Sequence, residues 1–455
     1  MASSNAFGEL GLSIIGLGAK YPPYSLRSDE VNKIAVKHYP DSPAMQKVLS
    51  INKYTGIDTR SSIGTSDYPS VNKSEAPSIA ELHKIFMSDG VPLAIEASRK
   101  AILEAGIDLS QITHIVSTTC TDSANPGFDH FVAKGLGITH QVEKVLLHGV
   151  GCAGGLTVLR TAANLALGHA MRRKAARILC VALEVSTTMV RSELNSIDEL
   201  QETRIGACLF SDCASALVLS NGIGHPTVEP IYDLLGWEHK IIPDTESDLG
   251  FDVDPVGWKV VLSPQVPKLA TEILRPSFAD LLENIPSLPA QCKEASDFDW
   301  AMHPGGLTIL TGAEKVMGIS PEHMRASYDR YMNHGNSSSA TIFSVMDRLR
   351  SKDMDAMAPG GRVRDYVVGC AFGPGIAIEM CMLKRNMRRG IDAAPETDSE
   401  ASRSEADEEA DWASIECRES VPGTPGSANA QGERKPTSLG DEIFVKEAIA
   451  SVEVD

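Results

Sequence analysis

Helical and strand patterns alternate along the first 385 residues, and this order constrains the fold more than any other feature of the sequence. Residues 94–107 have the apolar spacing of an amphipathic helix, and a short apolar strand pattern follows at 114–120. The same order returns later, where the helical pattern of 266–285 precedes a strand pattern at 297–303. Alternation of this kind predicts an α/β architecture, and its recurrence predicts two similar halves.

The charge distribution predicts where this ordered part ends. Residues 386–455 carry 17 acidic and 7 basic side chains and are rich in Ser, Pro and Gly, with almost no periodic apolar face. Such a segment buries too little apolar surface to offset the entropy lost on ordering. We therefore expect an N-terminal half at 1–228, a C-terminal half at 229–385 and a disordered acidic tail at 386–455.

Composition excludes several classes of protein. The net charge of −18 disfavours electrostatic binding to nucleic acid. No apolar run approaches the ~20 residues that a membrane span needs, and the N-terminal residues lack the pattern of a secretory signal. The nine cysteines are scattered through apolar segments without paired spacing, which is typical of reduced thiols. We expect a cytoplasmic protein.

One of these cysteines stands out by its position. Cys152 lies in the glycine-rich turn GVGCAGG, between a strand pattern and a long helical pattern. A thiol at a helix N-terminus faces unpaired N–H groups and the positive end of the helix dipole, which favour the thiolate. A cysteine is more often a buried structural residue. The strand–turn–helix placement nevertheless favours a reactive nucleophile here.

Two later motifs offer partners for a nucleophile. In WAMHPGG, His303 ends a strand pattern immediately before a Pro-Gly-Gly turn, a position typical of functional sites. In HGNSSSA, Asn336 precedes another helical pattern. Asn336 alone could be a helix N-cap, but together with Cys152 and His303 its amide can donate to an anion.

The same glycine-rich turn permits a second interpretation. Gly149, Gly151 and Gly154 fit the GxGxxG pattern of dinucleotide-binding proteins, and Glu184 ends the next strand pattern. This alternative predicts a nicotinamide-dependent oxidoreductase. The pattern lies in the middle of the chain, and a cysteine occupies the turn that would contact the phosphates.

The motifs GVGCAGG, WAMHPGG, HGNSSSA and AFGPG, in this order, resemble those of type III polyketide synthases, the chalcone-synthase-like branch of the thiolase superfamily. The resemblance covers roughly residues 10 to 385. It implies a thiolase-like five-layer αβαβα fold of two similar halves and a homodimer. It also implies decarboxylative condensation of malonyl-CoA onto an acyl-CoA starter, without a metal or an attached cofactor.

The resemblance assigns roles to matching residues. Cys152 matches the acyl-accepting nucleophile, and His303 and Asn336 match the pair that holds the thioester carbonyl of malonyl-CoA. Other positions match the substrate cavity and its entrance: Cys120, Thr121, Ser186, Met189, Phe210, Phe251, Val260, Ser338, Phe372, Gly373 and Pro374. The basic residues that match the CoA contact region are Lys47, Lys53 and Arg60.

The cavity residues also suggest a substrate class. Cys120, Ser186 and Ser338 are small, and Val260 stands where plant members have an aromatic residue, so a roomier cavity is expected. These features, with the acidic tail, resemble fungal members that extend long-chain fatty acyl-CoA starters to alkylpyrones, alkylresorcinols or alkylresorcylic acids. A ketoacyl-acyl-carrier-protein synthase of the initiating kind, which also uses Cys, His and Asn, is an alternative.

Overall fold

The computed structural model describes residues 10–139, 141–224 and 229–392, and its main feature is a nine-stranded mixed sheet. The strand order is β11-β12-β13-β8-β1-β7-β6-β4-β5. The strands are β1 (Ser13–Lys20), β4 (His114–Thr118), β5 (Glu143–Leu147), β6 (Arg177–Glu184), β7 (Cys213–Ser220), β8 (Tyr232–Ile241), β11 (Asp299–Met302), β12 (Tyr366–Gly373) and β13 (Ala377–Arg385). Strands β1 and β8 pair only through Ser13 with Asp233 and Ile14 with Tyr232, so the sheet consists of two parts with a short seam.

The two parts of the sheet have the same topology. In the N-terminal part the order is β5-β4-β6-β7-β1, with β4 parallel to β6 and β7 antiparallel to both of its neighbours. In the C-terminal part the order is β11-β12-β13-β8, with β11 parallel to β12 and β13 antiparallel to both neighbours. The second part therefore repeats the first without an equivalent of the edge strand β5. The prediction of two similar α/β halves is confirmed.

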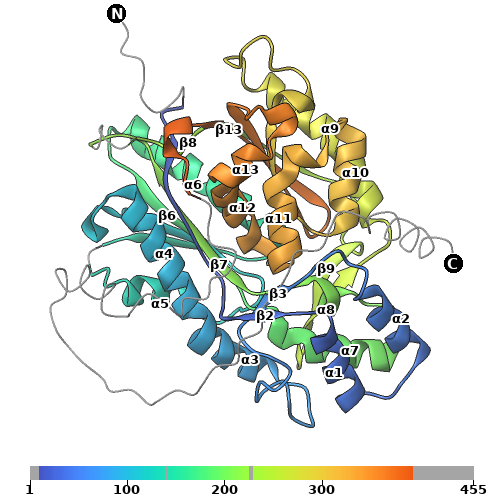
Figure 1. Cartoon of the computed structure of the whole chain (residues 1–455). Helices are drawn as coiled ribbons and strands as arrows, with labels where there is room; N and C mark the ends of the chain where they lie inside the picture. Colours follow the sequence, from blue (N-terminus) through green and yellow to red (C-terminus); the bar gives the residue numbers. More distant parts are fainter. Residues whose placement is uncertain (1–9, 140, 225–228, 393–455) are drawn as a thin grey trace, which may run out of the picture. The chain divides into compact units, whose positions relative to one another are not determined.

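Helices form three layers around the two parts of the sheet (Figure 1). Helices α6 (Gly154–Met171) and α12 (Thr341–Leu349) pack between the parts and share one apolar core with both. Helices α4 (Val91–Ala105) and α5 (Phe128–Gly135) cover the other face of the N-terminal part. Helices α9 (Val266–Glu283) and α10 (Leu307–Met317) cover the C-terminal part. This is the expected five-layer αβαβα arrangement.

The layers explain why the central elements are apolar on every side. In β6 successive side chains alternate between two cores: Ile178 and Cys180 face the central helices, whereas Leu179 and Val181 face α4 and α5. A strand buried on both faces has a continuous apolar sequence. The carboxyl group of Glu184, at the end of this strand, is therefore an exception that requires an explanation.

Smaller elements lie beside the sheet and bound a pocket described below. Helices α1 (Asp29–His38), α2 (Pro43–Ile51), α7 (Val190–Leu200) and α8 (Gly206–Leu209) share a separate small core. A two-stranded ribbon, β9 (Leu249–Asp254) and β10 (Gly257–Leu262), lies against α7 and α8. The remaining helices and strands include β2 (Tyr24–Leu26), β3 (Arg60–Ser62), α3 (Ile79–Ile85), α11 (Arg325–His334) and α13 (Lys352–Ala356).

The C-terminal segment is described through residue 392, past the expected start of the tail at 386. Asn386 Nδ2 donates to Pro230 O at 2.9 Å, and Ile391 N donates to Arg350 O at 3.3 Å, so these residues are attached to the sheet and to α12's end. The rest of the predicted tail, 393–455, lies outside the described residues. In the part of the chain that the structure describes, every helix is too short or too polar to traverse a bilayer.

Candidate active site

The turn that carries Cys152 has the predicted strand–turn–helix form. The chain leaves β5, passes through a short 3₁₀ helix at Gly151–Ala153 and enters α6 at Gly154. Gly151 has φ +47°, and a Cβ atom there would lie 2.6 Å from the ring of Pro374. Glycine is therefore required both by the backbone conformation and by the close approach of the loop after β12.

Both central helices begin at this site. Ser338 opens the 3₁₀ helix Ser338–Ala340 that precedes α12, just as Cys152 precedes α6. Cys152 Sγ lies 3.3 Å from Ser338 Oγ, and Cys120 Sγ lies 3.3 Å from the same oxygen. The bare Cα of Gly154 permits this approach, because a Cβ there would lie 2.9 Å from Ser339 Cβ. The internal repeat of the fold thus brings Cys152, Ser338 and Cys120 together.

His303 is buried at the end of β11, with 1% of its surface exposed. Its backbone N donates to Cys370 O at 2.7 Å, which fixes the residue against β12. Neither ring nitrogen has a hydrogen-bond partner among the described residues. Buried polar atoms are nearly always paired in proteins, so two unpaired ring nitrogens indicate that this imidazole hydrogen-bonds to a bound ligand.

Asn336 is held beside His303 by its backbone and its side chain. Its backbone N donates to Leu209 O at 3.0 Å, and its carbonyl accepts from Ser211 N at 2.9 Å. Its Nδ2 donates to Gly305 O at 3.1 Å, and its Oδ1 accepts from Ser338 N at 2.8 Å.

These contacts place the predicted catalytic residues in one group. A Cβ added to Gly305 would lie 3.8 Å from His303 Nε2, so Gly305 lies between the imidazole and the Asn336 amide. Asn336 in turn orients Ser338, which contacts Cys152. An amide nitrogen carries two protons, so Nδ2 keeps one donor beyond the bond to Gly305.

Burial favours the neutral forms of both the Cys152 thiol and the His303 imidazole. It raises the pKa of the Cys152 thiol to about 12 and lowers the pKa of the His303 imidazole to about 3. Burial thus opposes the stabilisation of the thiolate that the helix N-terminus is expected to give. His303 is likewise not an imidazolium by itself. A thiolate requires proton transfer from Cys152 to a neighbour that compensates its charge.

Glu184, which the sequence interpretation considered only for the dinucleotide alternative, lies at the candidate site. This carboxyl group is wholly buried and accepts from Cys120 N at 3.1 Å, from Thr121 Oγ1 at 3.0 Å and from Ser339 Oγ. Burial raises its pKa, and these donors oppose the rise. Its position after an unbroken apolar strand pattern was the available signal. Glu184 connects the segment after β4, which carries Cys120 and Thr121, to the segment that carries Ser338 and Ser339.

The geometry also contradicts the dinucleotide interpretation. The glycines of GVGCAGG are covered by protein: Gly151 lies under Pro374, and a Cβ on Gly155 would lie 2.4 Å from Ile342. Glu184 is buried among hydroxyl and amide donors and is not available to a ribose. No room remains for a pyrophosphate at the start of α6.

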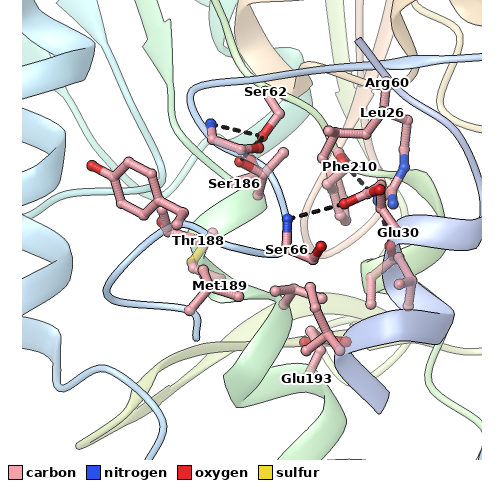
Figure 2. A pocket seen from close by; sticks show the side chains of 18 of the residues that line it. Leu26, Glu30, Arg60, Ser62, Ser66, Ser186, Thr188, Met189, Glu193 and Phe210 are labelled. Atoms are coloured by element: carbon pink, nitrogen blue, oxygen red, sulfur yellow. Dashed lines mark hydrogen bonds between the residues drawn. The ribbon is translucent and has the colours of Figure 1, made fainter. Parts of the chain in front are cut away.

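Four predicted cavity residues line one pocket (Figure 2): Ser186, Met189, Phe210 and Val260. About half of the remaining lining residues are aliphatic or aromatic, among them Val31, Ile34 and Trp258, and hydroxyl and charged side chains make up much of the rest. Phe251 packs near Phe210 with ring centroids 6.0 Å apart. Phe210 also pairs with Asn336 through a backbone bridge, so the pocket adjoins the Cys-His-Asn group.

Glu193 is a second carboxyl group that the sequence interpretation missed. It lines the same pocket from α7 (Figure 2), and its Oε1 accepts from Val260 N at 2.5 Å. Its Oε2 has no partner among the described residues, and burial raises the pKa of the group to about 7. The burial of this carboxyl group could not be predicted from sequence, because α7 has the polar side chains typical of an amphipathic surface helix.

The loop residues Phe372, Gly373 and Pro374 cover the nucleophile turn. A Cβ on Gly373 would lie 2.8 Å from Ala153 Cβ, and Pro374 lies against Gly151. Phe372 packs into the core on the α9 and α10 side of the sheet. The C-terminal half therefore forms one wall around a nucleophile that the N-terminal half supplies.

The three basic residues assigned to CoA contacts have different environments. Lys47 and Lys53 are exposed in and after α2, and neither makes an ion pair or side-chain hydrogen bond with a described residue. Arg60 is 5% exposed and donates to the carbonyl oxygens of Ala207 and Phe210. Arg60 thus stabilises the segment that carries Phe210.

Comparison with known proteins defines the class. The model of the N-terminal domain of chalcone and stilbene synthases matches residues 14–223, and the model of the C-terminal domain matches 234–387. The chain therefore belongs to the chalcone and stilbene synthase family of type III polyketide synthases. These enzymes are acyltransferases that form carbon–carbon bonds by condensation with malonyl-CoA. This membership excludes the oxidoreductase and decides against the carrier-protein-dependent synthase.

Several of the similar proteins are fungal. The type III polyketide synthase pspB of Penicillium soppii is 40% identical over 395 residues, which are 82% of this chain and 96% of that protein. The acylalkylpyrone synthase csyB of Aspergillus oryzae is 39% identical over 378 residues, 82% of this chain and 94% of that protein. Among solved structures, a type III pentaketide synthase from Neurospora crassa is 69% identical, with a TM-score of 0.82 over 83% of this chain and all of that one.

Proposed function

We propose that Cys152 carries the growing acyl chain, and that His303 and Asn336 activate malonyl-CoA for each extension. The acyl group of a starter CoA thioester passes to Cys152 Sγ, and free CoA leaves. The thiol proton goes to His303, the neutral base with two unpaired ring nitrogens in this group. The single observation that supports this assignment is the buried, unpaired imidazole of His303 beside the amide of Asn336.

The extension step follows from the same two donors. The thioester oxygen of malonyl-CoA accepts from His303 Nε2–H and from the second Nδ2 hydrogen of Asn336. Cleavage of the carboxylate bond releases carbon dioxide and leaves the electron pair in an enolate, whose negative oxygen these donors stabilise. The enolate carbon attacks the thioester carbonyl, the bond to Cys152 Sγ breaks, and the extended chain remains on CoA; its transfer back to Cys152, with release of free CoA, starts the next extension. Because decarboxylation generates the carbon nucleophile, no strong base is required.

A long-chain fatty acyl-CoA is the starter that the pocket favours. Phe210, Trp258, Val260 and other apolar side chains form part of its lining, and it adjoins Asn336 through the Phe210 bridge. An alkyl chain in this pocket gains about 0.8 kcal/mol per buried methylene. The similarity to an acylalkylpyrone synthase and to a pentaketide synthase supports alkylpyrones, alkylresorcinols or alkylresorcylic acids as products.

A panel of starters tests this proposal. Purified full-length protein is incubated with acyl-CoA starters of increasing chain length and with isotope-labelled malonyl-CoA, and the products are identified by mass spectrometry. We expect long alkyl starters to be extended several times with the highest kcat/KM. Turnover restricted to short or aromatic starters would overturn the fatty-acyl assignment and leave the condensing activity intact.

Lys47 and Lys53 are the proposed CoA phosphate contacts. Both are exposed and unpaired among the described residues, and α2, which carries Lys47, adjoins α8 just before Phe210. Arg60 lines the pocket but acts through the backbone of Ala207 and Phe210. Charge reversal at Lys47 and Lys53 is expected to raise KM for both CoA substrates with little change in kcat.

We also propose a homodimer. Strand β5 is an edge strand that pairs with β4 on one side only among the described strands, and it presents partly exposed Val145, Leu146 and Leu147. An unpaired apolar edge beside the nucleophile turn is a surface that a second copy can cover. Sedimentation of the full chain tests this, since a monomer at assay concentration would remove the dimer.

A further inference from the structure

Two histidines and a glutamate form a cluster at the end of the N-terminal half away from Cys152. His114 begins β4, Glu143 begins β5 and His169 lies in the last turn of α6. Each offers one ligand atom, and these atoms all lie within 4.8 Å of one another. Cys152 precedes α6 by two residues, so the helix rise of 1.5 Å per residue places the cluster about 25 Å from the nucleophile.

His114 provides an independent sign that this cluster binds something. Its side chain is 1% exposed, and its Nε2 has no hydrogen-bond partner among the described residues. The nearest charged atom is Glu143 Oε2 at 3.6 Å, beyond hydrogen-bond distance. A buried ring nitrogen without a partner, directed at a carboxylate it does not reach, leaves space for an atom between them.

The hydrogen bonds of the two imidazoles leave lone pairs on the nitrogens that face the cluster. His169 Nδ1 lies 3.3 Å from Ala175 O, and because a carbonyl only accepts, Nδ1 carries the proton and Nε2 a lone pair. His114 Nδ1 lies 2.8 Å from Thr113 Oγ1, whose own proton is directed to Arg177 O at 3.0 Å. His114 Nε2 is then also unprotonated. Metal-binding histidines are typically oriented in this way by a second hydrogen bond.

We propose that His114, Glu143 and His169 bind a divalent transition-metal ion, preferentially zinc, as a structural site. Ligands of a tetrahedral zinc ion lie roughly 3.4 Å apart, because zinc bonds to nitrogen and oxygen are about 2.0–2.2 Å long. The 3.6 Å between His114 Nε2 and Glu143 Oε2 fits this spacing. Glu143 is 71% exposed, so its side chain is free to adjust and water can fill the fourth position.

The ion would connect three segments at one end of the N-terminal half. It would link the start of β4 and the edge strand β5 to the C-terminal turn of α6. Its distance from Cys152 separates it from the condensation chemistry, so the proposal predicts a gain in stability and is independent of the proposed function.

Zinc binding by the full-length protein tests the site. After alkylation of the accessible cysteines, zinc is titrated against a chromophoric chelator, and thermal unfolding is followed with and without zinc. We expect one zinc per chain and a rise in Tm of about 3–6 °C at saturating zinc. Magnesium is expected to produce neither effect, because imidazole ligands suit zinc and its neighbours.

Variants of the two more accessible ligands locate the site. Glu143→Gln and His169→Gln are each expected to weaken zinc binding at least tenfold and to abolish the rise in Tm. His130→Gln, at an exposed histidine of α5, is the matched control and should bind zinc like the wild type. Absence of binding to the wild type, or equal binding by all three variants, would overturn the proposal. Circular dichroism without zinc verifies that each variant is folded.

Discussion

At the scale of single residues, the site combines two groups that burial keeps neutral. Burial raises the pKa of Cys152 and lowers the pKa of His303, so neither ionises readily by exchange with water. A thiolate in this environment needs a counter-charge, and in the proposed mechanism the imidazolium of His303 supplies it. The reactivity of Cys152 is therefore expected to depend on His303 and not on the helix N-terminus alone.

Alkylation of Cys152 tests this dependence. The rate of inactivation by iodoacetamide, measured across pH, follows the thiolate fraction. We expect His303→Gln to slow inactivation near pH 7 by at least about tenfold and to shift its midpoint to higher pH. His334→Gln, at a partly buried histidine, is the control for a general effect of losing an imidazole. Equal pH profiles for wild type and His303→Gln would contradict the proposed pair.

The amide of Asn336 is expected to act mainly in the transition state for decarboxylation. Asn336→Ala removes one enolate donor and should lower kcat for malonyl-CoA decarboxylation about 10²–10³-fold. Asn333→Ala is the matched control, because the side chain of this exposed asparagine bonds only within α11. Release of carbon dioxide from carboxyl-labelled malonyl-CoA is the readout. A loss below threefold in Asn336→Ala would contradict the assignment.

Sequence reasoning predicted Cys152, His303 and Asn336 because each adjoins a turn with a distinctive glycine or proline pattern. It missed Glu184 as a site residue, because only the folded chain shows that segments after β4 and before α12 supply its hydrogen-bond donors. It also gave no sign that Arg60 is buried. Burial of a charged side chain depends on which carbonyls reach it, and sequence spacing does not contain that information.

At the scale of elements, the nucleophile turn and the loop after β12 hold each other in place. Gly151→Ala is expected to lower kcat strongly while the protein stays folded, since its Cβ would lie 2.6 Å from Pro374 at φ +47°. Gly149→Ala is the matched control, with φ +76° and no atom within 4 Å of the added Cβ. Both variants strain the backbone, but only Gly151→Ala also introduces the steric clash with Pro374. Steady-state kinetics of the two variants therefore separate the effect of strain from the effect of the clash. Equal losses would show that strain alone matters.

The ribbon strand β10 is expected to set the length of the acyl pocket. Val260→Phe places a ring in the pocket and should lower kcat/KM for long alkyl starters at least about tenfold relative to short ones. Val261→Phe is the matched control, because neighbouring strand residues face opposite sides. Competition between long and short starters gives the ratio. An unchanged ratio for Val260→Phe would show that the acyl chain of the starter does not bind in this pocket.

The order of the long strands and helices was predictable from sequence, whereas the short elements that line the pocket were not. Strands such as β6 are long unbroken apolar runs, and helices such as α4 have clear amphipathic spacing. The segments around the pocket are short, and α8 has only four residues, so periodicity carries little signal there. Their positions follow from packing against α2 and α7.

At the scale of the whole molecule, the internal repeat explains why residues of both halves meet at the site. Each half contributes one helix of the central layer, and the N-terminal ends of these two helices, α6 and α12, meet where Cys152 contacts Ser338. His303 and Asn336 come from the C-terminal half and the nucleophile from the N-terminal half. The site is therefore incomplete in either half alone.

Buried neutral histidines predict the pH dependence of stability. The pKa of His303 is lowered to about 3 and that of His334 well below its usual value, both mainly by burial. Between about pH 6.5 and the lowered native pKa, the unfolded chain binds more protons than the native one. Stability is therefore expected to fall as the pH drops below about 6.5, by up to about 1.4 kcal/mol per pH unit for each such group. Urea denaturation between pH 4.5 and 7.5 measures it, and constant stability over that range would contradict buried neutral imidazoles.

In the proposed mechanism, Cys152 holds the acyl chain while His303 and Asn336 promote decarboxylation. The most direct test is Cys152→Ala with labelled malonyl-CoA and an acyl-CoA starter. The account predicts that this variant still releases carbon dioxide and forms acetyl-CoA, because His303 and Asn336 remain, but gives no acyl-protein adduct and no extended product by mass spectrometry. Extended product from Cys152→Ala, or loss of decarboxylation together with extension in a folded variant, would contradict it.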